Sequence, residues 1–435
     1  MKLSKLTVAC LVALSGVSLS NVVNASTSID GFEFSGYFRY GTYTSVENDY
    51  SLSEDDYVAQ KETLGRLGLE VDDDANVGFS KTWDVNDGKS VKFSTSIDDD
   101  GTLSGGLEFK GITSSGTLWA GKMDYGKENY VWMTDFFYTD MSGTGVGIKG
   151  YEIGDLSFDL AYIASNRDDL DDDTEDDYYS ENTNNDNLDN WMHAVNFAVT
   201  YDALKVSMLA KAMPDNWAED GTKYATKGYD ISVIYSLDNF FWIPGNGHAQ
   251  IITQAGKGLG SGNLLAGTIT SYNSYHPGSL FQGEHSDWTW ASAGYGDATR
   301  LITYVDDGDS SARVILWGGY TFDNGISLNP AIEAQYNDHV NNSNGSYDYW
   351  IAGMVRPIFP VSEHFFVQAE MGRVLNNWDG TQYGQWKYTI APTVIMSTGT
   401  GIDPQIRFTA TYVDNAWTVD AGHDIIFGIQ ATVNI

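Results

Sequence analysis

The last nine residues of the chain alternate strictly between apolar and small or polar side chains. Phe427, Ile429, Ala431, Val433 and Ile435 share one parity, and Gly, Gln, Thr and Asn fill the positions between them. Because successive side chains of a β-strand point to opposite faces, this segment predicts a strand with one apolar and one polar face. In a secreted chain without a hydrophobic helix after its leader, repeated alternation is typical of an outer-membrane β-barrel.

The first 25 residues have the features of a secretory signal peptide. Two lysines precede an apolar stretch over residues 6–19, and small residues before position 26 suit cleavage there. The sequence therefore predicts a signal peptide at 1–25 and one outer-membrane β-barrel domain at 26–435. The only cysteine, Cys10, lies within this leader, and lipoprotein cleavage there would leave too short an apolar stretch. The mature chain is expected to have no thiol and no disulfide.

Composition excludes two classes of protein. The chain has 59 Asp and Glu against 24 Lys and Arg, a formal net charge of −35, so nucleic acid is not an expected partner. A hydrophobic content of 42% with a mean hydropathy of −0.29 argues against a helical membrane bundle. Aromatic residues at 14%, 46 Gly and only 8 Pro favour a β-rich wall with tight turns.

Further alternating segments follow along the chain, each close to the roughly 9 to 11 residues that a tilted strand needs to cross a bilayer. Two of them form a hairpin across the two-residue turn 202–203, and long polar stretches occupy 166–190 and 258–298. The expected strand segments are 156–162, 196–201, 204–213, 229–237, 249–255, 313–322, 326–336, 365–371, 388–396 and 405–412. We expect an all-β, antiparallel transmembrane barrel of about 16 to 18 strands, an even number, that is wide enough for a water-filled channel.

Several motifs resemble the maltoporin family of sugar-specific porins. The segment 117–122 followed by 135–147 is similar to that family's strand, third loop and glycine-rich return. Further matches in the family's order span nearly the whole mature chain: 34–39, 66–68, 254–259, 355–358 and 404–412.

The resemblance implies a barrel of about 18 strands, with the third loop folded into the lumen, that assembles as a homotrimer in the outer membrane of a Gram-negative bacterium. It also implies facilitated diffusion of maltose, maltodextrins or other oligosaccharides along an aromatic slide flanked by charged residues. Sugar rings have apolar faces that lie on aromatic rings, and hydroxyls that hydrogen-bond to Arg, Asp and Glu. Weak sites in series permit transit.

Site residues carry over from the family position by position. Tyr37 matches the first aromatic residue of the slide, and Arg39 and Arg66 match arginines among the charged residues that flank it. Asp135 and Asp140 match carboxylates of the third loop.

Other positions match with differences. Phe137 keeps the ring of a constriction tyrosine without its hydroxyl, and Lys127 lies near a third-loop arginine, with one extra residue in this chain. Trp132 lies one residue from a family histidine and could supply a stacking surface, which predicts weaker sugar block in Trp132→Ala.

Several slide positions depart from the family. Asp74 stands where an aromatic is expected, Gly401 where a tryptophan is, and residues 434–435 replace terminal tryptophans. The second-loop segment 98–105 is short and carries no tryptophan. These departures leave the identity of the sugar open.

Each candidate also has a purely structural interpretation. Arg39 and Arg66 could balance acids of the lumen, Tyr37 could belong to an aromatic girdle, and Phe137 could pack the third loop against the wall.

The chain shows no cofactor motif and no catalytic triad, so an enzyme is not expected. The acidic run 168–177 could bind Ca²⁺, but it lacks the turn glycine and closing glutamate of an EF-hand, which favours a solvated loop. The seven histidines are scattered, and no metal site is expected. Two functions remain: a sugar channel in contact with outer-membrane lipid, or a general or cation-preferring porin that has lost sugar specificity, which the acidic charge would permit.

Overall fold

The computed structural model describes residues 27–29, 31–46, 50–52, 61–70, 73–98, 101–166, 191–214, 223–268, 305–338, 347–378, 381–396, 402–414 and 422–434. The predicted signal peptide, the acidic run 168–177, Gly401 and Ile435 lie outside these residues.

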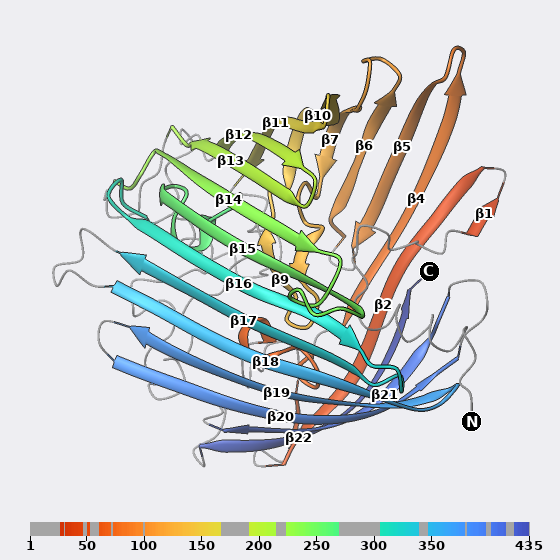
Figure 1. Ribbon diagram of the computed structural model, residues 1–435, viewed down its shortest axis with the longest axis vertical. Coiled ribbons are helices and arrows are strands. Elements are labelled where there is room, and N and C mark those ends of the chain that lie inside the picture. Colours follow the sequence, from red (N-terminus) through yellow and green to blue (C-terminus); the bar gives the residue numbers. More distant parts are fainter. Residues whose placement is uncertain are drawn as a thin grey trace, which may run out of the picture.

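Eighteen antiparallel strands among the described residues close into a barrel (Figure 1). Consecutive wall strands pair with each other, and β2 closes the wall against β22, with Tyr37 opposite Asn434. The wall strands are β2 (Phe32–Ser45), β4 (Asp74–Val85), β5 (Lys89–Asp98), β6 (Leu103–Lys110), β7 (Thr117–Met123), β10 (Gly143–Ile153), β11 (Leu156–Asn166), β12 (Trp191–Tyr201), β13 (Leu204–Ala212), β14 (Lys227–Leu237), β15 (Asn246–Gly258), β16 (Ser310–Thr321), β17 (Ser327–Asp338), β18 (Tyr347–Ser362), β19 (Phe365–Trp378), β20 (Thr381–Ile395), β21 (Gln405–Asp414) and β22 (His423–Asn434).

The remaining elements are short. Strands β1 (Thr27–Ile29) and β3 (Tyr50–Leu52) pair with β2, and β8 (Asn129–Val131) pairs with β9 (Phe136–Thr139). Helix α2 (Lys61–Leu64) and the 3-10 helix η3 (Gly262–Leu264) lie in connections between wall strands. No helix among the described residues is long and apolar enough to cross a membrane.

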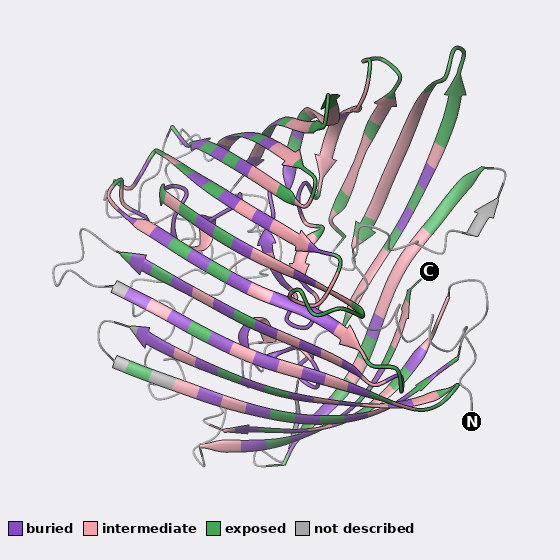
Figure 2. Ribbon diagram, viewed as in Figure 1, coloured by how far each residue is buried: buried purple, intermediate pink, exposed green. Residues whose placement is uncertain are grey.

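Along most wall strands burial alternates with the period of two that the sequence predicts, whereas β5, β6 and β7 are mostly of intermediate burial (Figure 2). On β22, Phe427 and Ile429 are exposed, whereas Gly428 and Gln430 are buried. We call the two sides the exposed face, which is mainly apolar, and the buried face, which carries most of the polar side chains. All the predicted strand segments lie within or overlap observed strands, and β12 and β13 form the predicted hairpin, with Asp202 at a φ of 51° in its turn.

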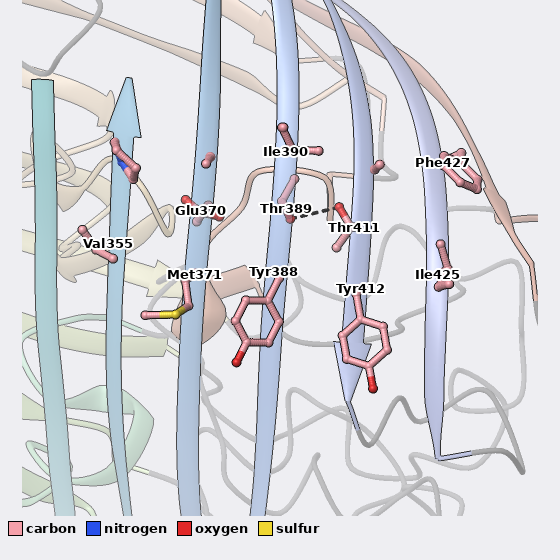
Figure 3. A pocket seen from close by; sticks show the side chains of 13 residues that line it. Val355, Glu370, Met371, Tyr388, Thr389, Ile390, Thr411, Tyr412, Ile425 and Phe427 are labelled. Atoms are coloured by element: carbon pink, nitrogen blue, oxygen red, sulfur yellow. Dashed lines mark hydrogen bonds between the residues drawn. The ribbon is translucent and has the colours of Figure 1, made fainter. Parts of the chain in front are cut away.

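A hollow of about 520 Å³ on the wall over β18–β22 shows the alternation at close range (Figure 3). Tyr388 and Tyr412 border it and are exposed. Thr389, which follows Tyr388, and Thr411, which precedes Tyr412, are buried and hydrogen-bond to each other at 3.0 Å. The hollow thus lies on the apolar, exposed face, and the polar candidate residues are found on the other side of the wall.

Candidate functional site

Two segments outside the wall lie against its buried face. We call residues 61–70, which comprise α2 and the turn after it, the first segment, and residues 124–142, which carry β8 and β9, the third segment. The first segment contacts β18–β20. The third contacts buried-face residues of β15 to β18.

A buried glutamate of the wall holds the first segment. Glu370 on β19 accepts a hydrogen bond from the backbone N–H of Leu67 at 3.1 Å. The same carboxylate forms ion pairs with Arg356 on β18 and Lys387 on β20, both at 2.5 Å. All three charged side chains are almost fully buried, so each depends on the others for compensation.

Gly372 on the same strand allows the first segment to approach the wall closely. A Cβ at Gly372 would lie 2.2 Å from the carbonyl oxygen of Leu64, a distance that no side chain tolerates. The backbone of α2 therefore lies directly on β19, where Gly372 provides space.

A second buried glutamate, Glu70, gathers three arginines. Its carboxylate lies 2.5 Å from Arg66, 2.9 Å from Arg39 on β2 and 3.5 Å from Arg407 on β21. Burial alone would raise the pKa of the Glu70 carboxyl, but Arg66, then Arg39 and Arg407, hold this pKa well below its usual range. Glu70 is therefore a permanent anion at neutral pH.

Four of the predicted site residues meet above this glutamate. Arg66 is ion-paired with Asp135 of the third segment, and its guanidinium also donates to the hydroxyl of Tyr37 at 3.4 Å. Arg39 donates to the same hydroxyl at 3.3 Å. Asp135 has a positive φ of 55°, an uncommon backbone conformation for a residue other than glycine. In this conformation its carboxylate forms the ion pair with Arg66. This cluster joins a wall strand, the first segment and the third segment.

Aromatic rings of the third segment continue the cluster. Phe137 stacks on Tyr130 with 5.0 Å between ring centroids, and the Lys127 ammonium lies 5.6 Å from the Phe137 ring. Burial raises the pKa of Tyr130, whose charge environment includes Arg66 and Asp135. The Tyr130 hydroxyl is therefore protonated at neutral pH.

Trp132 lies on a guanidinium. The Arg356 carbon Cζ is 4.7 Å from the ring centre, and the indole nitrogen has no hydrogen-bond partner among the described residues. The neighbouring carbonyl of Met133 accepts hydrogen bonds from the Arg66 backbone at 2.7 Å and from Arg356 at 3.2 Å. That single carbonyl connects the third segment to both the first segment and the wall.

Neutral hydrogen bonds and ring packing hold the middle of the third segment. Tyr138 donates to Gln250 at 2.6 Å and accepts at its carbonyl from Gln254 at 2.5 Å. Phe136 packs edge-on against Trp350 of β18 with 5.8 Å between centroids. These contacts hold the middle of the third segment against β15 and β18.

Asp140 does not join the cluster. Its side chain is fully buried and accepts from the backbone and hydroxyl of Ser142 at 3.0 and 2.5 Å. Its backbone exchanges hydrogen bonds with Ala266 and Thr268, just after η3. The structure places Asp140 in a tether between two connections, where its carboxylate is hidden from solvent.

Sequence reasoning missed Glu70, Glu370, Arg356 and Tyr130. Glu370 carried a usable signal, since an acid in the middle of a strand, on the parity of the buried residues, needs a cationic partner. Among the described residues, no group of three His, Cys, Asp or Glu side chains could hold a metal ion.

Comparison with known proteins identifies the family. The profile of the LamB porin family matches residues 32–433. The chain belongs to the LamB porin family. With the closed barrel, this membership places it in the outer membrane of a Gram-negative bacterium.

Individual relatives are distant. A maltoporin of Vibrio cholerae is 29% identical over 153 residues, which cover 32% of this chain and 36% of that protein. The chain thus spans about a third of the length of this relative. Maltoporin 2 of Yersinia pestis is 26% identical over 442 residues, 93% of this chain and 92% of that protein. Among solved structures, OmpT of Vibrio cholerae in its trimer form gives a TM-score of 0.41 at 13% identity, covering 93% of this chain and 99% of that one.

Proposed function

We propose that this LamB porin is a passive channel for oligosaccharides of the maltose and maltodextrin type or related sugars. The observation that carries the proposal is the convergence of Tyr37, Arg66 and Asp135, from three separate parts of the chain, beside the stacked rings of Tyr130 and Phe137. A ring face next to charged donors and acceptors suits a sugar, which has an apolar face and a rim of hydroxyls.

In this proposal the buried face lines an aqueous lumen, and the third segment is a loop folded inward to narrow it. Tyr37, Trp132 and Phe137 provide ring surfaces. Arg39, Arg66, Lys127 and Asp135 exchange hydrogen bonds with sugar hydroxyls. Asp140 keeps its predicted role only if its tether opens, because its carboxylate is buried. The channel performs no chemistry and needs no cofactor or metal.

The assembly proposed for the channel is a homotrimer surrounded by outer-membrane lipid. The maltoporin names of the relatives support the sugar class, and the trimer is proposed from the resemblance of the motifs to the maltoporin family. The predicted leader 1–25 and the domain 26–435 fit a secreted outer-membrane protein.

A general or cation-preferring porin is the alternative function. It is favoured by the net charge of −35 and by Asp74, a carboxylate at an expected aromatic position, which lies 3.4 Å from Arg39. An acidic pore attracts cations whether or not it binds sugars.

Ion-current recording in a planar bilayer distinguishes the two proposed functions. Ion current through the purified protein is recorded while maltodextrins, then sucrose, cellobiose and chitin oligomers are titrated. Saturable, concentration-dependent closure by one series establishes a sugar channel and identifies the sugar class. Current that no sugar blocks, with strong cation preference, rejects the sugar channel and leaves the general porin.

A further inference from the structure

The connection between β14 and β15 contains a turn with an uncommon backbone. Phe241 and Trp242 have positive φ angles of 47° and 67°, and the N–H of Ile243 donates to the carbonyl of Phe240 at 2.9 Å. Two consecutive residues with positive φ define a turn that normally selects Asn and Gly. Bulky aromatic residues are strained in this conformation, so their presence indicates a role that small turn residues do not fill.

The turn folds over the exposed face of the wall. Two glycines provide the space: a Cβ at Gly247 would lie 2.9 Å from the Phe240 Cβ, and a Cβ at Gly245 would lie 2.5 Å from the Tyr320 hydroxyl. That hydroxyl donates to the carbonyl of Pro244 at 3.3 Å. The ring centroids of Phe240 and Tyr320 are 6.0 Å apart. The turn is thereby fixed against β15 and β16 on their outer side.

Residues of the wall at this end are covered, although they belong to the exposed face. Leu237 is 8% exposed and Ala249 is 1% exposed. Thr253 and Ala255 share the parity of Ala249 farther along β15, and both are exposed. The outer side of the wall is therefore more enclosed next to the turn than farther along β15.

The side chains at the tip of the turn are apolar and exposed. Trp242 is 64% exposed and Ile243 is 50% exposed, and neighbouring Phe322 continues the apolar surface from the next connection, 4.9 Å from the Tyr320 ring. This tip lies at the end of the barrel that carries the short connections 86–88, 111–116, 154–155, 202–203, 322–326 and 363–364. It is continuous with the apolar face of the wall, which meets the hydrocarbon of the membrane.

We propose that the turn Phe240–Ile243 is a lipid-binding anchor. Trp242 and Ile243 insert between the headgroups and acyl chains of phospholipid, and Phe240 and Tyr320 hold them at that depth. Tryptophan suits this position because its ring is apolar while its N–H still finds a polar partner at the interface. The anchor fixes how deep the barrel sits on the side of β14–β16, independently of what passes through the channel.

Site-directed labelling tests this directly. In a Cys10→Ser background the chain has no other cysteine, so Ile243→Cys can carry one bimane fluorophore, and Asp323→Cys, in the neighbouring short turn, provides the matched control. The full chain is reconstituted in phosphatidylethanolamine and phosphatidylglycerol vesicles, with and without nitroxide-labelled lipid. We expect lipid nitroxide to quench the label at 243 and aqueous iodide to quench the label at 323. Equal quenching of both labels by iodide, with none by lipid, overturns the anchor and indicates a surface that faces water or a soluble protein.

A second variant separates anchoring from strain. Replacing Phe241→Asn together with Trp242→Gly supplies the residues that such turns favour, so the turn itself is relaxed while the rings are lost. We expect the double variant to unfold at a lower urea concentration than the wild type in vesicles, despite its better turn. An equal or higher midpoint would show that the turn is only a connector and would overturn the proposal.

Discussion

The first and third segments both lie against the buried face of the wall, but different interactions hold them there. The first segment depends on buried charges, with Glu370 and Glu70 each gathering cationic side chains around the turn after α2. The third segment depends mainly on apolar burial and neutral hydrogen bonds, with Met133 and Phe136 fully enclosed.

This difference has a physical reason. Ion pairs fix the orientation of the side chains that form them, because a carboxylate must face its partners. Apolar contacts require that the side chains fill the available space, but they do not specify one donor or acceptor. The first segment therefore orients arginines, and the third segment positions a rigid row of rings. Each can be weakened separately, which makes the comparison testable.

The largest effect is expected at the charge cluster of the first segment. Glu370→Ala leaves Arg356 and Lys387 buried without their anion, which should cost about 3–5 kcal/mol in the free energy of unfolding. Urea unfolding in lipid vesicles measures it, with Asp155→Ala in an exposed turn as control. A cost below about 1 kcal/mol would contradict the importance of buried charge here.

A somewhat smaller effect is expected from packing in the third segment. Met133→Ala removes a fully buried side chain and leaves a cavity, at an expected cost of about 3 kcal/mol. The backbone carbonyl and its hydrogen bonds remain. The same unfolding assay applies, with exposed Met396→Ala as control, and a cost equal to that of the control would show that this segment is not held by packing.

The pH dependence should distinguish the two segments. The folded-state pKa of Glu70 is lowered, so its stabilisation is present above the unfolded-state pKa of roughly 4.3 and is lost as pH falls toward the folded-state value. At neutral pH, Glu70→Gln should cost about 2 kcal/mol through weakened charge-assisted hydrogen bonds.

The gap in stability between wild type and Glu70→Gln should therefore narrow below about pH 4, whereas the cost of Met133→Ala should change little. Unfolding midpoints of the three proteins across acid pH measure this. A gap between wild type and Glu70→Gln that stays constant to low pH would contradict the assignment of charge to the first segment.

The smallest effect concerns the sugar itself. Trp132→Ala removes one ring while Arg356 keeps Glu370, so sugar block should weaken by about fivefold, equivalent to about 1 kcal/mol. Titration of single-channel current gives the dissociation constant. Trp191→Ala, on the strand β12 away from the cluster, should leave block unchanged, and unchanged block in Trp132→Ala would remove the ring from the proposed site.

Local periodicity predicted the wall well because each strand shows its two faces within its own sequence. The parity of Phe427 and Ile429 is enough to place β22, and the turn at 202–203 is enough to pair β12 with β13. Family resemblance added Tyr37, Arg66 and Asp135, which the structure brings into one cluster.

The missed residues depend on contacts between distant parts of the chain. Leu67 and Glu370 are 303 residues apart, and no local pattern reports such a partner. Arg66 lies in a turn, so the alternation of its neighbours gave no information about Glu70 or Met133. The strain at Phe241 and Trp242 was equally invisible, because aromatic residues in a short turn are compatible with an ordinary connection.

The Met133 carbonyl has a mechanical consequence. Because it accepts from Arg66 and Arg356 together, neither the first nor the third segment can shift away from the other without breaking a hydrogen bond to the wall or to its neighbour. Displacing either segment relative to the other therefore costs at least one hydrogen bond. In the proposed channel, a constriction braced in this way resists widening between the two segments, so it sorts solutes by whether they fit.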